Sequence, residues 1–158
     1  MKLWMALFII LFLTACSVND TKYTGYGVAY SDIDGILFVE TTASAENRKS
    51  DRRELVWLRD LDENDLGSRL EISLGRAKDT SYPAKAELKM KKVLHSQKEK
   101  EAILKGLNFL REQNPAQLFQ INNVSAESQG KWHIEFESIE NTIVIKLQIS
   151  SSDIRVVN

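Results

Sequence analysis

The sequence predicts an α+β fold, in which antiparallel β-strands form most of the domain and one amphipathic helix packs on them. Three observations carry this prediction. Two are the clean alternation of apolar and polar residues over residues 84–91 and a capped helical pattern over residues 97–113. A third is the set of strand-like segments that follow the helix. Because the apolar stripe of one helix matches one open face of an antiparallel sheet, we expect the helix to cover one side of a single sheet.

Four segments before the helix are predicted to be strands. Gly35–Thr42 is rich in β-branched and aromatic residues and follows the turn-like Asp32–Gly35. Glu54–Arg59 is compatible with a strand or a helix, and we expect a strand. Residues 70–74 alternate, and in residues 84–91 four apolar side chains alternate with lysines and a glutamate, as on a strand with one face in water.

The helix begins at a capping box. Ser96 is expected to accept a hydrogen bond from a free backbone amide, while Glu99 reaches back to the start of the helix. Asn114-Pro115 then ends the helix. Apolar residues recur between these ends at helical spacing, at Ala102, Ile103, Leu107 and Leu110.

The segments after the helix are predicted to form a meander. Leu118–Val124, Lys131–Glu137 and Thr142–Ile149 are strand-like, with turn residues between them, and Ile154–Val157 is a short last strand. In the second of these, Trp132, Ile134 and Phe136 are expected on one face, with Lys131, His133, Glu135 and Glu137 on the other.

Composition indicates one globular domain, which we place at residues 25–158. Of the 158 residues, 43% are hydrophobic and 27% are charged, as in ordinary globular proteins and unlike disordered chains. The formal net charge is -1, without the positive excess of a nucleic-acid-binding protein. We therefore expect no nucleic-acid partner.

The N-terminus has the pattern of a signal peptide. Lys2 provides a positive charge, and Leu3–Leu13 is an unbroken apolar run. Eleven helical residues span roughly 16 Å, about half of the hydrocarbon core of a membrane, so this run is a poor transmembrane helix. Its length is typical of the apolar region of a signal peptide.

Leu13-Thr14-Ala15-Cys16 directly follows this run, and Cys16 is the only cysteine. The segment resembles the lipobox of bacterial lipoproteins, with an aliphatic residue, a spacer, a small residue and a cysteine. The resemblance implies that residues 1–15 are a signal peptide, cleaved between Ala15 and Cys16, and that Cys16 carries diacylglycerol. Two or three acyl chains anchor a protein durably in a membrane.

The residues after the cysteine bear on sorting. In Gram-negative lipoproteins an Asp directly after the lipidated cysteine commonly signals retention in the inner membrane, and this chain has Ser17 there. The resemblance therefore implies the outer membrane, facing the periplasm, in a Gram-negative host. In a Gram-positive host it implies the outer surface of the plasma membrane. Residues 16–24 are polar after the cysteine and are expected to be a short tether.

An acidic segment after the third predicted strand resembles a calcium-binding loop in spacing. Asp60, Asp62, Asn64 and Glu71 match ligand positions 1, 3, 5 and 12. Asp65, however, occupies position 6, where the sharp turn needs Gly. We expect a solvated acidic loop and no metal, with these four residues as the candidate ligands of the alternative.

Other candidate site residues have simpler structural explanations. Asp32 and Asp34 are expected to form a turn rather than a catalytic carboxylate pair, and His95 and His133 to lie at the surface. No nucleophile elbow, zinc set or phosphate loop is present in the sequence, and we expect no cofactor. A basic group is expected to keep an edge strand soluble, with anionic head groups or glycans as alternative contacts; it comprises Lys85, Lys89, Lys91 and Lys92. The aromatic residues expected in the core are Trp57, Trp132 and Phe109.

Together these features predict a membrane-anchored envelope protein that binds or assembles an envelope protein or glycan without catalysing a reaction. One alternative is an envelope-acting enzyme whose site is built from Asp32, Asp34, His95 or His133, since catalytic groups meet in space rather than in sequence. The other alternative is a calcium-dependent module that uses residues 60–71.

Overall fold

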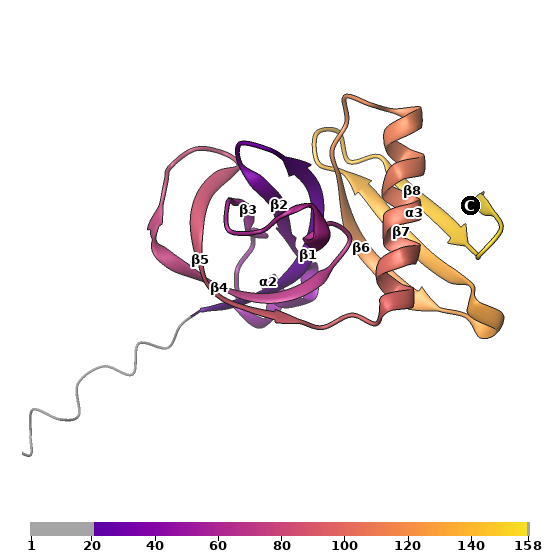
Figure 1. Cartoon of the computed structure of the whole chain (residues 1–158), viewed down its shortest axis with the longest axis horizontal. Helices are drawn as coiled ribbons and strands as arrows, with labels where there is room; N and C mark the ends of the chain where they lie inside the picture. The colour runs from indigo at the N-terminus through magenta and orange to yellow at the C-terminus, as the bar shows by residue number, and fades with distance from the viewer. Residues whose placement is uncertain (1–20, 158) are drawn as a thin grey trace, which may run out of the picture.

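A computed structural model describes residues 21–157 (Figure 1). The predicted signal peptide, the predicted cleavage site after Ala15, and Cys16, the predicted site of lipidation, lie outside the described residues. Among the described residues, no helix is long and apolar enough to cross a membrane.

Nine strands and two α-helices, with two short 3-10 helices, make up the described part of the chain. Their order and bounds are β1 Lys22–Ser31, β2 Gly35–Glu40, α2 Thr42–Asn47, β3 Leu55–Leu58, η1 Glu63–Asp65, β4 Arg69–Lys78, β5 Ala84–Val93, α3 Gln97–Gln113, β6 Phe119–Ala126, η2 Ser128–Gly130, β7 Trp132–Ser138, β8 Val144–Ile149 and β9 Ile154–Val157.

The first five strands close into a barrel in the order β1-β2-β3-β5-β4. All neighbouring pairs are antiparallel except β3 and β5, which are parallel. Fully buried aliphatic and aromatic side chains fill the interior, and Gly25 on β1 leaves room for the ring of Phe38, which a Cβ would approach to 2.6 Å. These interior side chains include Ile36, Phe38, Val56, Leu58, Leu70 and Ile72.

The last four strands form a separate antiparallel sheet in the order β6-β7-β8-β9, and α3 packs on one face of it. Ile103, Leu107 and Leu110 of the helix are buried, Phe136 and Leu147 of the sheet are fully buried, and Gly106 of the helix lies close to the ring of Phe136. Ser96 accepts the expected hydrogen bond from the Glu99 amide, at 3.1 Å. The Glu99 carboxylate lies 3.7 Å from Arg69 of β4, so it pairs with the barrel rather than completing the capping box.

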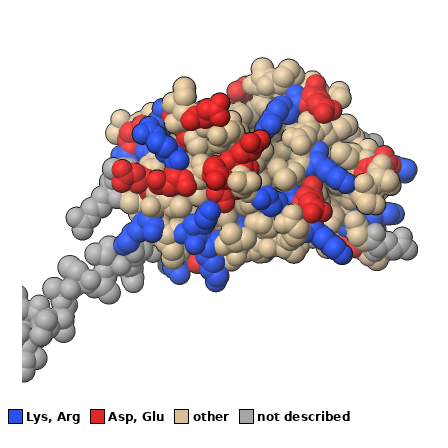
Figure 2. Space-filling view, viewed as in Figure 1, with Lys and Arg blue, Asp and Glu red and all other residues tan. Residues whose placement is uncertain are grey.

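Charged side chains of both signs are interspersed on the surface. On the face shown in Figure 2, lysines and arginines alternate with aspartates and glutamates over both the barrel and the sheet. No large field of one sign covers this face, in keeping with the nearly balanced composition.

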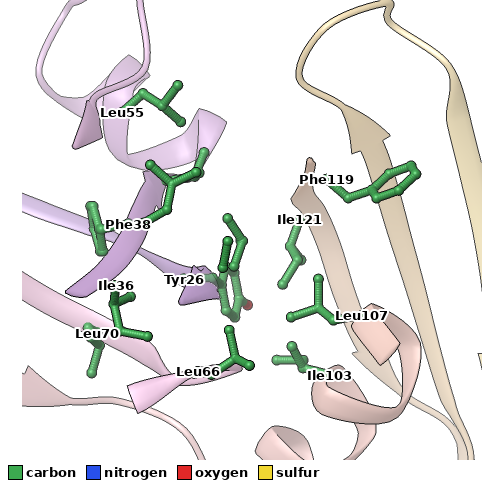
Figure 3. Packing of buried hydrophobic residues seen from close by; sticks show 14 of the residues in the cluster. Tyr26, Ile36, Phe38, Leu55, Leu66, Leu70, Ile103, Leu107, Phe119 and Ile121 are labelled. Atoms are coloured by element: carbon green, nitrogen blue, oxygen red, sulfur yellow. The ribbon is translucent and has the colours of Figure 1, made fainter. Parts of the chain in front are cut away.

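One continuous hydrophobic core joins the barrel to the sheet and α3. All six residues of β2 are buried, so neither the inner nor the outer face of this strand reaches water. Figure 3 shows how the contact is made: Tyr26 of β1 points away from the barrel interior, toward Ile121 of β6 and Ile103 and Leu107 of α3.

The structure confirms the α+β class, the helix at 97–113 and the C-terminal meander, but the prediction of a single sheet was wrong. The strands before the helix close on one another, since β3 pairs with β5 across a long sequence separation. The prediction also missed α2. Strand β1 begins at Lys22, so residues 22–24 of the expected tether belong to the barrel.

Candidate functional site

Three of the four candidate calcium ligands, Asp60, Asp62 and Glu71, use their carboxylates for contacts elsewhere in the chain. Asp62 caps η1, with Oδ1 accepting from the Asn64 amide at 2.8 Å. Asp60 accepts from the Leu88 amide at 2.7 Å, and Glu71 lies on β4, 3.5 Å from Lys22. Among residues 21–157, no group of three or more His, Cys, Asp or Glu is arranged to hold a metal ion.

The two aspartates of the β1–β2 connection form a turn, as expected, and diverge. Ser31 Oγ accepts from the amides of Ile33 and Asp34, which fixes the bend before Gly35. A hydrogen bond to Asp32 raises the pKa of Tyr30. Asp34 does not share this contact and instead forms an ion pair with Lys85 of β5.

The two histidines have separate structural partners. His95 Nδ1 lies 3.2 Å from the Arg69 amide, which donates to it, and the ring is half-buried rather than fully at the surface. His133 faces outward on β7, with Nε2 3.1 Å from Glu127 Oε2, and this contact lowers the pKa of Glu127. Neither histidine contacts Asp32 or Asp34 in the described residues, so the four candidate catalytic residues do not form one site.

Three predicted residues from different segments do come together. Asp34, Asp60 and Lys85 line a surface groove of about 210 Å³ over β3 and β5. The remaining lining residues are Trp57, Arg59, Ala86 and Glu87.

Trp57 forms the aromatic part of this groove. Its neighbours on β3, Val56 and Leu58, are fully buried in the barrel interior, so Trp57 points to the outside. There it stands opposite Lys85 in the parallel register, and its indole is only half-buried. The sequence prediction placed Trp57 in the core, and this is correct in part, because the side chain is partly buried and packs against the core from outside the barrel. Its position between two interior residues was the signal that it faces the other way.

The charged side chains around the Trp57 groove include both paired and unpaired ones. Lys85 Nζ lies 2.7 Å from Asp34 Oδ1, which is buried and has no well-directed donor in the described chain, so the contact is an ion pair rather than a hydrogen bond. Arg59 and Glu87 are exposed, and neither side chain pairs with another described residue. An indole surface bordered by free donors and acceptors suits binding through stacking and hydrogen bonds.

The basic group of the prediction is only partly as expected. Strand β5 pairs with β3 over residues 84–86 and with β4 over residues 86–93, so it is part of a closed barrel rather than the edge strand of an open sheet. Lys85 pairs with Asp34, and Lys91 lies 2.9 Å from Asp65. These two lysines therefore hold the barrel surface together as well as keeping it soluble.

Comparison of this chain with protein-family models, with curated proteins and with solved structures finds no match. Architecture alone does not define a function, so the functional argument rests on the groove.

Proposed function

We propose that this chain is a lipid-anchored protein of the bacterial envelope whose barrel binds an envelope glycan at the Trp57 groove. The observation that carries the proposal is the half-buried, outward-facing indole of Trp57 within a concavity lined by hydrogen-bonding side chains. The proposal concerns binding, since no observation in the described residues favours a reaction centre.

A sugar ring matches the chemistry of this groove. Its C–H face is apolar and stacks on an aromatic ring, while its hydroxyls donate and accept hydrogen bonds at the edge. Glu87 and Asp60 supply acceptors, and Arg59 supplies donors. A nucleic acid fits less well, because three carboxylates line the groove against two basic side chains, and the excess negative charge would repel phosphates.

Support for the anchor comes from the sequence around Cys16. The lipobox resemblance implies acyl chains on Cys16, and Ser17 implies the periplasmic face of the outer membrane in a Gram-negative host. Because β1 begins at Lys22, the chain between the anchor and the barrel reaches at most about 20 Å. The groove would then work close to the membrane surface, where envelope glycans are accessible.

Tryptophan fluorescence tests the glycan proposal. The lipid-free chain from Ser17 holds two tryptophans, Trp57 and Trp132, because Trp4 lies in the predicted signal peptide. In a Trp132→Phe variant, Trp57 is the only reporter, and soluble fragments of the host's envelope glycan should change its emission saturably. Glu87→Gln or Arg59→Gln, each exposed, should weaken binding by about fivefold through the loss of a hydrogen bond.

The matched control is Trp57→Phe, which keeps Trp132 as its only reporter and removes the indole from the groove. Its emission should not respond to the same fragments. A response from Trp132 alone would place the glycan elsewhere. Absence of any response in both variants, with no heat in calorimetry, would contradict the proposal.

A further inference from the structure

A second and larger cavity opens where the barrel meets the C-terminal sheet. It has a volume of about 430 Å³ and receives residues from both parts of the chain. The lining residues that matter here are Leu55, Val39, Arg52, Tyr82, Glu137 and Ile139. It lies next to the Trp57 groove, because Leu55 and Trp57 are two residues apart on the same face of β3.

The floor of this cavity is apolar. Val39 of β2 and Leu55 of β3 face out of the barrel and are nearly fully buried, and Ile139 at the end of β7 packs beside them. Three aliphatic side chains in one floor favour an apolar group of a ligand, such as an amino-acid side chain.

One wall is a polar network centred on Glu137. Its Oε2 accepts from Gln120 at 2.6 Å, from Asn122 at 3.1 Å and from Arg53 at 3.1 Å, while Arg53 also donates to Asn122 at 2.9 Å. Burial opposes ionisation of Glu137, but these hydrogen bonds outweigh it and lower its pKa. The carboxylate is therefore charged at neutral pH, and Oε1 remains free of protein hydrogen bonds in the described residues.

The open side carries a positive charge and an aromatic ring. Arg52 is exposed, and its guanidinium makes no hydrogen bond or ion pair within residues 21–157. Tyr82, at the tip of the β4–β5 connection, is 81% exposed. Since Arg53 and Glu137 neutralise each other, Arg52 makes the cavity positive in a chain of slightly negative net charge.

We propose that this cavity binds the terminal carboxylate of a short peptide with an apolar side chain. Arg52 pairs with the carboxylate in the bidentate geometry that guanidinium favours. The side chain of the last residue lies on Val39, Leu55 and Ile139, and Tyr82 covers it. A peptide N–H donates to the free Oε1 of Glu137, and the apolar floor favours an aliphatic side chain over the hydroxyls of an acidic sugar.

Calorimetry on the lipid-free mature chain, which contains every described element, tests this proposal. The probe is N-acetyl-Ala-Leu with a free carboxylate, and the comparison ligand is its carboxamide. We expect the carboxylate to bind at least tenfold more tightly, and Arg52→Gln to remove that advantage, since charge-assisted hydrogen bonds are the strong ones. Arg52 is exposed and unpaired, so the variant should fold normally.

Arg59→Gln is the matched control, because Arg59 is also an exposed, unpaired arginine but lies in the Trp57 groove. It should leave peptide binding within twofold, which separates this proposal from the glycan proposal. Equal affinity for acid and amide, no effect of Arg52→Gln, or no binding at 10 mM would each overturn it. Tighter, Arg52-dependent binding of glucuronate would overturn the peptide assignment in favour of an acidic sugar.

Discussion

Glu40 is fully buried and still makes every contact that a carboxylate needs. Arg48 donates to it through two nitrogens, at 2.8 and 2.5 Å, Ser44 Oγ donates at 2.7 Å and the Glu54 amide at 2.8 Å. Burial opposes its ionisation, but these hydrogen bonds outweigh burial and lower its pKa. The same Arg48 lies over the ring of Tyr23, 4.7 Å from its centroid, so one residue ties β2, α2 and the start of β1 together.

Glu40→Gln should lower the free energy of unfolding at pH 7 by about 2 kcal/mol, because it weakens hydrogen bonds to a charged group. The native chain should also lose stability as the pH falls below about 5. The unfolded Glu40 takes up a proton near its ordinary pKa, while the folded carboxylate resists protonation until a lower pH. This contribution is complete above the unfolded pKa and lost as the pH falls through the folded one.

Urea denaturation at pH 7, 5 and 4 measures both effects. The Glu40→Gln variant should show a shallower fall in stability with pH than the native chain. Glu46→Gln, on the exposed face of α2, is the control and should change neither value. A Glu40 variant with native stability and native pH dependence would contradict the role assigned to this carboxylate.

At the scale of elements, sequence patterns predicted the features that depend on interactions within a few residues. Helix α3 has the predicted bounds because Ser96 caps it and Pro115 follows its end, and both features act within a few residues. The closure of the barrel depends instead on β3 meeting β5 and β1 meeting β4, far apart in the sequence. The sequence held one signal of the burial of β2: residues 36–39 are apolar without alternation, as in a strand buried on both faces.

The candidate site shows the same division. The turn at Asp32 and Asp34 and the outward position of His133 follow from local pattern, and the structure confirms both. The groove joins Asp34, Trp57 and Lys85 through barrel pairing, which single-segment patterns do not contain. The Arg52 cavity also needs the contact between barrel and sheet, so it was beyond prediction from the sequence.

Gly106 in α3 gives an element-scale prediction. In an exposed helix Gly→Ala stabilises by about 1 kcal/mol, but a Cβ here would lie 2.6 Å from Phe136 Cζ and 3.0 Å from Ile149 Cδ1. Phe136 is fully buried and cannot yield easily. We therefore expect Gly106→Ala to destabilise the chain by about 1–3 kcal/mol, through overpacking.

Thermal unfolding followed by circular dichroism measures this change. Asn108→Ala, an exposed position on the same helix, is the control and should raise the melting temperature slightly through helix propensity. A Gly106→Ala variant that melts above the native chain would show that α3 does not pack against β7 as closely as described.

At the scale of the whole molecule, the contact between barrel and sheet links structure to the proposed functions. The Arg53–Glu137 pair and the continuous core hold the two parts together, and the two concavities lie side by side along the outer face of β3. Binding at either site is tested on the lipid-free chain, but the proposed setting of both ligands, next to a membrane-anchored barrel, depends on the proposed lipid at Cys16.

Metabolic labelling with a fatty-acid probe, followed by membrane fractionation, tests that dependence most directly. We predict that the full-length chain incorporates the probe and fractionates with membranes. Cys16→Ser should abolish labelling and leave an unprocessed precursor or a soluble species, because Cys16 is the only thiol in the chain. Labelling that persists in the Cys16→Ser variant, or a native chain that takes up no lipid, would contradict the account.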